Sequence, residues 1–114
     1  YLFEADPAAI RAHALGGFGL LSLGSTPGYL TGDELISSPW LKAYRVLWHG
    51  RPDFAHLRAE LRRLNAKTPE LKQRGAGYEL ADLRKKLKCE GDRPLIVAFW
   101  ADAPKIHAAI LEMP

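Results

Sequence analysis

The sequence predicts an α/β fold of the α+β type, in which helices pack on a mixed β-sheet. Segments typical of strands and helices alternate after residue 43 in the order β-α-β-α-β-β, and the last two form a hairpin around the short turn "DAP". The chain has 114 residues, of which 47% are hydrophobic and 25% charged, as in globular proteins with one modest core. We therefore expect a single domain spanning residues 1–114.

The part of the chain before residue 43 gives weaker signals. The segment "EADPAAIRAHALGG" predicts a helix with Asp6 as N-cap, Pro7 in the first helical position and Gly16 at its end. A short strand is expected at Tyr29–Leu30. The segment "TGDELISSP" is expected to be a loop with one helical turn. The fold should therefore begin with a helix.

Three strands of the later part are predicted from composition. Aromatic and branched residues indicate a strand at Ala43–Gly50, and the apolar run "PLIVAFWA" indicates a central strand, buried on both faces, at Pro94–Ala101. The segment Lys67–Arg74 is a further strand, which Pro69 places at an edge or a strand start. The segment "KIHAAILEM" should pair with the central strand as a hairpin.

Two helices lie between these strands. The segment "PDFAHLRAELRRLN" carries Asp53 as a cap, and its apolar residues recur at helical spacing, at Phe54, Leu57, Leu61 and Leu64. The segment "YELADLRKKLK" is expected to place three leucines on one buried face, namely Leu80, Leu83 and Leu87.

Most of the positive charge is concentrated in the middle of the sequence. Residues 45–88 contain twelve basic and five acidic side chains, whereas each flanking segment contains two basic and four acidic ones. Such an asymmetry favours an anionic partner, although solvated helix faces would give the same count.

The residues give no pattern of a catalytic or metal site. The four histidines do not form a pair at helical spacing around a glutamate, although His49 and His56 could meet in space. Cys89 is the only cysteine, which excludes an internal disulfide and suits a reducing cytoplasm. No apolar run approaches the roughly 20 residues that cross a bilayer. We expect no catalytic residue, no metal and no membrane association.

Instead, a glycine turn surrounded by cations is the candidate site. Gly75 allows close approach of the backbone, and the cations before and after it could contact phosphate groups. The residues we assign to this nucleic-acid-binding site are Lys72, Arg74, Gly75, Arg84, Lys85 and Lys88. Additional cations are predicted nearby on the preceding helix at Arg58, Arg62 and Arg63. Three aromatic residues could stack on unpaired bases or belong to the core, namely Tyr44, Trp48 and Tyr78.

Four segments resemble the THUMP-like domain found in the C-terminal part of a group of bacterial class I S-adenosylmethionine-dependent methyltransferases. They are "YLFEADPAAIRA", "YLTGDELISSPWLKAYRVL", "ELKQRGAGYELADLRKKLK" and "PLIVAFW". The resemblance covers nearly the whole chain, and it is most specific at the K-x-R-G turn and the L-R-K-K-L helix. It assigns the site to Lys72, Arg74, Gly75, Arg84, Lys85 and Lys86, whereas Gln73 stands where a basic residue is expected.

The resemblance implies an accessory RNA-binding domain that is not catalytic by itself. The chain lacks an initiator Met and would be the C-terminal fragment of a longer methyltransferase. The cofactor S-adenosylmethionine would bind in an N-terminal domain, and none is expected in residues 1–114. The RNA, tRNA among the candidates, and the methyltransferase domain of the same chain are the implied partners, in the cytoplasm. The alternative is a docking or dimerisation module that packs on the methyltransferase domain without contacting nucleic acid.

Overall fold

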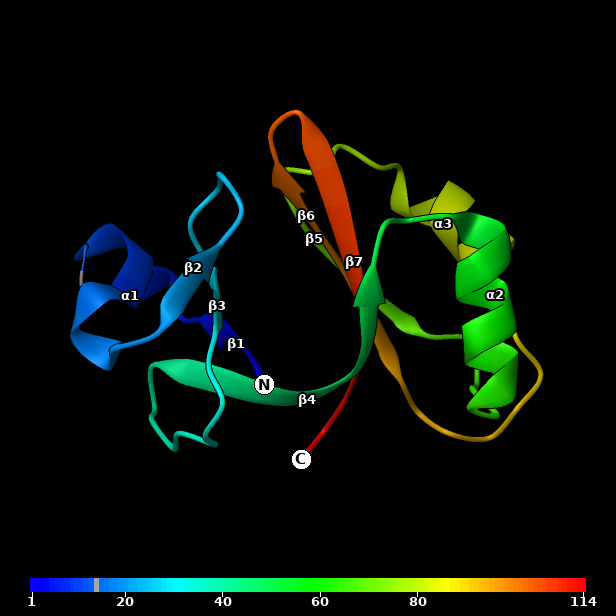
Figure 1. Ribbon diagram of the computed structural model, residues 1–114, viewed down its shortest axis with the longest axis horizontal. Coiled ribbons are helices and arrows are strands. Elements are labelled where there is room, and N and C mark those ends of the chain that lie inside the picture. Colours follow the sequence, from blue (N-terminus) through cyan, green and yellow to red (C-terminus); the bar gives the residue numbers. More distant parts are fainter. Residues whose placement is uncertain (14) are drawn as a thin grey trace.

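Seven strands form one mixed β-sheet at the centre of the protein (Figure 1). The computed structural model describes residues 1–13 and 15–114. The strands are β1 (Leu2–Ala5), β2 (Leu21–Leu23), β3 (Tyr29–Thr31), β4 (Leu41–Gly50), β5 (Glu70–Arg74), β6 (Ile96–Asp102) and β7 (Lys105–Glu112). The helices are α1 (Pro7–Arg11), α2 (Phe54–Arg63) and α3 (Leu80–Lys86), with a 3-10 helix, η1 (Leu15–Phe18). The strand order is β2-β3-β1-β4-β7-β6-β5, and only β5 and β6 pair in parallel among these strands.

Strand β4 belongs to both halves of the sheet. Its first residues, Leu41–Tyr44, pair with β1, and Arg45–Gly50 pair with β7. Between Val46 and Trp48 the register shifts by one residue, which is a β-bulge. A bulge bends its strand, and Figure 1 shows β4 turning sharply between its two ends. The bend separates an N-terminal half (β1–β3 and the start of β4) from a C-terminal half (the rest of β4 and β5–β7).

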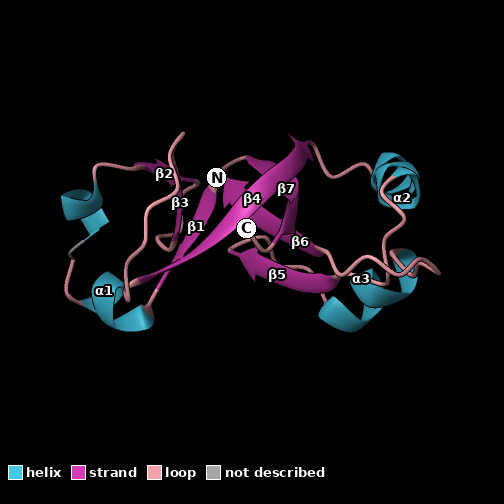
Figure 2. Cartoon of the chain, turned by 90° about the horizontal axis from the view of Figure 1, so that it is seen from below, coloured by secondary structure: helices cyan, strands magenta, loops and turns pink. Residues whose placement is uncertain are grey.

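The two halves bury apolar residues in three clusters. Helices α2 and α3 cover the outer face of the C-terminal half, where Leu57, Leu83 and Phe99 are buried (Figure 2). Helix α1 and η1 lie on the outer face of the N-terminal half, over Phe3 and its neighbours. The third cluster lies between the halves, where Tyr29 and Tyr44 of one half meet residues of β6 and β7. Each half of the sheet is thus covered on both faces.

The predicted α+β class and the element order after residue 43 are confirmed. Strand β6 is buried on both faces, and it forms the expected hairpin with β7. Strand β5 is an edge strand that starts directly after Pro69. Asp53 caps α2 by accepting a hydrogen bond from the backbone N–H of His56 at 3.2 Å. Short-range signals such as caps and periodicity therefore gave the type and order of the elements in this part of the chain.

The predictions for the N-terminal part were partly wrong. Asp6 and Pro7 start α1 as expected, but a strand, β1, precedes the helix, and β2 was also missed. Helix α1 ends at Arg11, and Gly16 belongs to η1 instead of ending the helix. The predicted helix also included Ala14, which lies outside the described residues.

Two further predictions of helical structure need correction. The segment from Gly32 to Pro39 is a loop, as expected, but Thr31 belongs to β3, and the described residues of the segment form no helical turn. Leu80 does not share the buried face of α3: its side chain is 38% exposed, against 2% for Leu83 and 0% for Leu87. Leu80 is the first residue of a helix that starts later than predicted, directly after the N-cap Glu79, and therefore lies at its exposed end.

A carboxylate near the C-terminus joins three parts of the C-terminal half. Glu112 of β7 accepts hydrogen bonds from Arg93, which precedes β6, at 2.6 Å and from Arg45 of β4 at 3.2 Å. The hydrogen bond from Arg93 is the main reason that the pKa of Glu112 lies below its usual range, and Arg45 adds to it. The ionised carboxylate therefore stabilises the folded protein.

We expect Leu83→Ala to lower the free energy of unfolding by about 2–5 kcal/mol, because it removes a buried side chain from the cluster under α3. Leu80→Ala is the matched control and should cost less, about 1 kcal/mol or below, because Leu80 is 38% exposed at the start of the helix. Urea denaturation measures both. Equal losses of stability in Leu80→Ala and Leu83→Ala would show that Leu80 belongs to the core.

We expect Glu112→Gln to reduce stability at pH 7 by up to about 1 kcal/mol, because both arginines are partly exposed to solvent. A lowered carboxyl pKa contributes stability above the unfolded pKa of about 4.3, and this contribution disappears as the pH falls through the folded pKa. The difference between wild type and variant should therefore shrink between pH 5 and strongly acidic pH (about 2–3) in urea titrations. The control is Glu34→Gln at an exposed loop position. A pH-independent difference for Glu112→Gln would contradict the prediction.

Candidate nucleic-acid interface

The structure divides the predicted basic residues between two faces of the sheet. On β5, Lys72 and Arg74 lie opposite Ala98 and Trp100 of β6, which belong to the cluster between the two halves. Because side chains alternate along a strand, Lys72 and Arg74 point to this inner face. Helix α3, which carries the other predicted cations, covers the opposite face. The predicted residues therefore do not form one continuous patch.

Lys72 contacts the N-terminal half of the protein. Its Nζ lies 3.1 Å from Glu4 Oε1 of β1 and 3.8 Å from Glu70 Oε1. The same ammonium group lies 5.9 Å from the ring centre of Tyr44. Lys72 is only 20% exposed and has two carboxylate neighbours, so its charge is largely neutralised within the protein.

Arg74 also crosses to the N-terminal half. Its guanidinium carbon lies 5.7 Å from the ring centre of Tyr29 in β3, within the range of a cation–π contact. Burial raises the pKa of Tyr29, Glu4 raises it further, and Arg74 opposes this shift. Tyr29 is therefore a neutral phenol at physiological pH, and its ring supports the arginine.

Gly75 permits a close approach, but within the protein. Its φ of +70° is in the left-handed region that favours glycine. A Cβ at this position would lie 2.5 Å from Oγ1 of Thr26, in the loop between β2 and β3. The turn after β5 therefore packs against the N-terminal half, and Gly75 provides the space for it.

Gln73 closes the glycine turn, a role that its sequence position did not reveal. Its side-chain amide donates to the carbonyl oxygen of Tyr78 at 2.8 Å and accepts from the backbone N–H of Tyr78 at 2.9 Å. A basic side chain could not make both hydrogen bonds, because it has no acceptor. The departure from the expected basic residue thus has a structural reason.

In contrast, three predicted cations on α3 and directly after it are free and exposed. Arg84, Lys85 and Lys88 are all exposed, and none of them forms an ion pair within residues 1–13 and 15–114. Glu79 caps the start of α3 by accepting from the N–H groups of Ala81 and Asp82 at 3.1 and 2.9 Å. The cations lie at the opposite end of the helix, where positive charge interacts favourably with the helix dipole.

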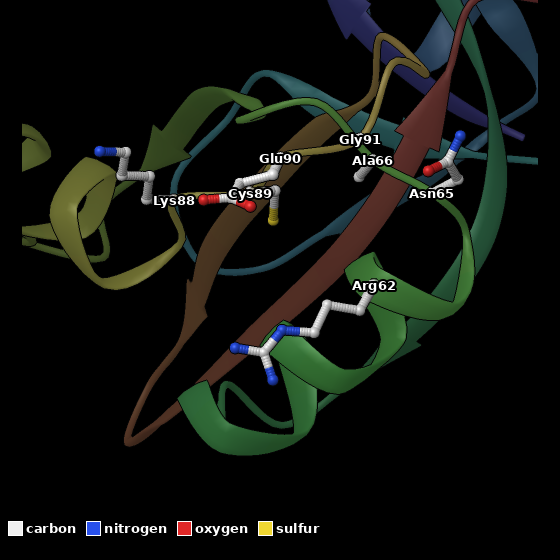
Figure 3. A pocket seen from close by; sticks show the side chains of 7 residues that line it. All are labelled: Arg62, Asn65, Ala66, Lys88, Cys89, Glu90 and Gly91. Carbon is white, nitrogen blue, oxygen red and sulfur yellow. The ribbon is translucent and has the colours of Figure 1, made fainter.

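The end of α2 adds a further cation to this region. Arg62 and Lys88 line a hollow of about 600 Å³ between α2 and the segment after α3. Figure 3 shows the Arg62 guanidinium and the Cys89 sulfur pointing into the same space, whereas the Lys88 side chain extends away from it. Glu90 is an acidic group of the lining. The hollow is therefore a mixed polar site with a positive rim.

The remaining cations of the two helices are engaged. Arg58 donates to the carbonyl oxygen of Lys86 at 3.3 Å, which joins α2 to the end of α3. Arg63 forms an ion pair with Glu60 at 2.8 Å. Lys86 lies 5.0 Å from the ring centre of Phe54. Of the residues predicted from the resemblance, Lys86 is thus partly used in packing the two helices.

Cys89 and His56 make contacts within the protein. Burial raises the pKa of Cys89, with Arg62 opposing the shift, and its thiol donates to the carbonyl oxygen of Leu87 at 3.3 Å. The ring of His56 lies 5.5 Å from that of Trp48. In the described part of the chain no three His, Cys, Asp or Glu side chains are close enough to hold a metal ion. In the same residues no helix is long and apolar enough to cross a bilayer.

The aromatic residues considered for base stacking belong mostly to the interior. Tyr44 is fully buried, so of the two alternatives considered for it, it belongs to the core. Tyr78 packs edge-on against Phe99, with ring centres 5.0 Å apart, and Trp48 packs against the cluster under α2 and α3. Trp40, which is 49% exposed, was not predicted as a candidate, because it stands in a loop without periodicity.

We expect Gly75→Ala to be more destabilising than Gly77→Ala. Both residues have positive φ, at 70° and 76°, so both variants carry a backbone cost of about 1 kcal/mol. Only Gly75 has a neighbour within 4 Å, so its variant should cost about 1 kcal/mol more in urea unfolding. In a Thr26→Ala background this excess should disappear. If the additional loss of stability persists in the Thr26→Ala background, it does not come from the contact with Thr26.

Comparison with known proteins identifies the family of the chain. Residues 41–111, which run from β4 to β7, match the model of the THUMP domain-like family. The chain is 32% identical over 103 residues to uncharacterized S-adenosylmethionine-dependent methyltransferases of two Mycobacterium tuberculosis strains, CDC 1551 / Oshkosh and ATCC 25618 / H37Rv. Each match covers 87% of this chain and 28% of the relative, so the chain spans little more than a quarter of their length. No solved structure gives a significant match. The chain belongs to the THUMP domain-like family, and its relatives are S-adenosylmethionine-dependent methyltransferases.

Proposed function

We propose that this chain is an accessory RNA-binding domain of an S-adenosylmethionine-dependent methyltransferase. Residues 1–114 would form one domain in the C-terminal part of the longer enzyme. The cofactor would bind in another domain, which would carry out the methyl transfer in the cytoplasm. A structured RNA such as tRNA is the proposed ligand of the present domain.

The observation that carries this proposal is the group of free cations at the end of α3. Arg84, Lys85 and Lys88 are exposed and make no ion pair in the part of the chain that the structure describes. Arg62 approaches the same region from α2, across the hollow that it shares with Lys88. Four cations without carboxylate partners favour an anionic ligand, and RNA phosphates supply closely spaced negative charges.

The position of these cations determines what kind of contact they can make. They lie at or near the C-terminal ends of α2 and α3, where backbone carbonyl groups and not N–H groups point outward. Phosphate groups would therefore be held by the long side chains alone. Such contacts position an RNA backbone but do not read its sequence. The binding should be weak, independent of sequence and strongly dependent on salt.

One observation favours the alternative, a module that docks on the methyltransferase domain. Strand β2 is the edge strand of the N-terminal half, and Leu21 in this strand is 74% exposed. An exposed edge with an apolar side chain can pair with another polypeptide segment. In this alternative the cations of α3 would only stabilise the end of the helix.

The double variant Arg84→Gln/Lys88→Gln should weaken RNA binding for all sequences alike. Two phosphate contacts would be lost, so the slope of log affinity against log salt should fall by about two units. Folding should change little, since both side chains are exposed. Fluorescence anisotropy with labelled tRNA over a range of salt concentrations measures the effect in the full-length protein.

Arg11→Gln/Lys105→Gln is the matched control, because it also removes one arginine and one lysine from exposed positions but far from α3 in the sequence. It should leave the slope nearly unchanged. Equal slopes for both double variants would reject the end of α3 as the RNA contact. Unchanged RNA affinity with easier proteolysis between the domains would support docking instead.

A further inference from the structure

Trp40 is exposed, and its backbone is held by two hydrogen bonds. Its side chain is 49% exposed, whereas Trp100 is only 8% exposed. Its backbone N–H donates to Ser38 Oγ at 3.1 Å, and its carbonyl oxygen accepts from the backbone N–H of Asp6 at 2.8 Å. Strand β4 begins at the next residue. An aromatic ring on so rigid a support loses little entropy when a ligand stacks on it.

Two cations share a hollow with this ring. The hollow has a volume of about 390 Å³, and Trp40, Lys42 and Arg74 are part of its lining. Lys42 is exposed at the start of β4, with its Nζ 5.7 Å from the ring centre of Tyr44. Arg74 is held on the ring of Tyr29, as described above. The hollow therefore combines an aromatic face with two anchored positive groups.

The acidic residues of the hollow are already engaged. Glu4 pairs with Lys72 at 3.1 Å and accepts a hydrogen bond from the Tyr44 hydroxyl at 3.4 Å. Asp6 is the N-cap of α1 and accepts from the backbone N–H of Ala8 at 2.8 Å. Lys42 and Arg74 make no ion pair within the described residues. They are therefore available to an anion.

We propose that this hollow binds one unpaired nucleotide of the RNA, with its base stacked on Trp40 and its phosphate on Lys42 and Arg74. An aromatic platform beside cations is the arrangement by which proteins hold single-stranded nucleic acid. A paired base is stacked within its duplex and could not reach the ring. The inference rests on the proposed RNA-binding function, and it adds a contact that distinguishes unpaired from paired RNA.

This hollow and the cations of α3 lie on different sides of the C-terminal half. Lys72 and Arg74 point to the inner face of β5, and α3 covers the outer face. Strand β5 is the edge of the sheet, so a strand of RNA could pass round this edge from one surface to the other. The end of α3 would hold the RNA backbone, and Trp40 would select an unpaired base farther along the RNA strand.

The test compares Trp40→Leu, Trp40→Phe and Leu35→Ala in the full-length protein. Binding to an unpaired oligoribonucleotide and to an RNA duplex is measured by anisotropy. Removing the stacking ring should weaken binding of the unpaired RNA by about 5-fold to 100-fold and leave the duplex within about 2-fold. Trp40→Phe should restore most of the affinity, because it retains a ring. Leu35→Ala, at a neighbouring loop position that is 54% exposed, should have no effect.

A second measurement uses the unchanged protein and does not depend on how a variant folds. An unpaired oligoribonucleotide containing 4-thiouridine is cross-linked to the protein, and mass spectrometry should find the adduct between Ser38 and Lys42. No adduct there, unchanged affinity of Trp40→Leu for unpaired RNA, or an equal loss for duplex RNA would each overturn the proposal. If Trp40→Leu keeps its RNA affinity but makes the full-length protein easier to cleave between its domains, Trp40 contacts another part of the protein and the proposal is overturned. If Arg84→Gln/Lys88→Gln has no effect on RNA binding while the adduct at Trp40 forms, the proposed RNA contact at the end of α3 is wrong and the proposed nucleotide site in the hollow is retained.

Discussion

The bend in β4 determines how the rest of the protein is arranged. One additional residue in this strand, between Val46 and Trp48, turns the first part of the sheet back over the second. The inner faces of the two halves then meet, and the cluster around Tyr29, Tyr44 and Trp100 forms between them. Without the bend, β5 would present Lys72 and Arg74 to solvent. With it, they are half-buried between the two halves and contact β1 and β3.

The contact between the halves gives the glycine turn a structural role that the sequence did not reveal. Alternating cations beside glycines are typical of a phosphate site, and the local pattern therefore predicted phosphate contact at this turn. The structure uses the same features to join distant segments: Lys72 to Glu4, Arg74 to Tyr29 and Gly75 to Thr26. Each partner lies more than forty residues away in the sequence. No local pattern could have revealed these partners, because the contacts depend on the bend in β4.

The sequence was most informative where structure depends on near neighbours. Caps such as Asp6 and Asp53, the apolar run of β6 and the edge position of β5 were predicted from a few adjacent residues. The short strands β1 and β2 were missed because their pairing with β3 and β4 supplies their stability, while three or four residues carry little propensity of their own. Leu80 was misplaced for a related reason: periodicity gives the face of a helix but not where the helix begins. The exposed cations of α3 were located correctly, since exposed residues depend little on long-range packing.

The contacts of the basic residues between 45 and 88 indicate which surface is available to the proposed RNA ligand. Of the twelve basic residues between 45 and 88, six have side chains that contact a carboxylate, a carbonyl oxygen or an aromatic ring, namely Arg45, Arg58, Arg63, Lys72, Arg74 and Lys86. The other six, for which the described residues show no such contact, are Arg51, Arg62, Lys67, Arg84, Lys85 and Lys88. Interaction with the helix dipole stabilises some of these free cations, but it contributes only about 0.3–1 kcal/mol per charge and is screened by salt. Lys88 lies beyond the last turn of α3, and four of these six cations gather at the ends of two adjacent helices. The mutual repulsion of these exposed charges is reduced by water and salt, and a polyanion would neutralise it more fully, which favours the proposed RNA ligand.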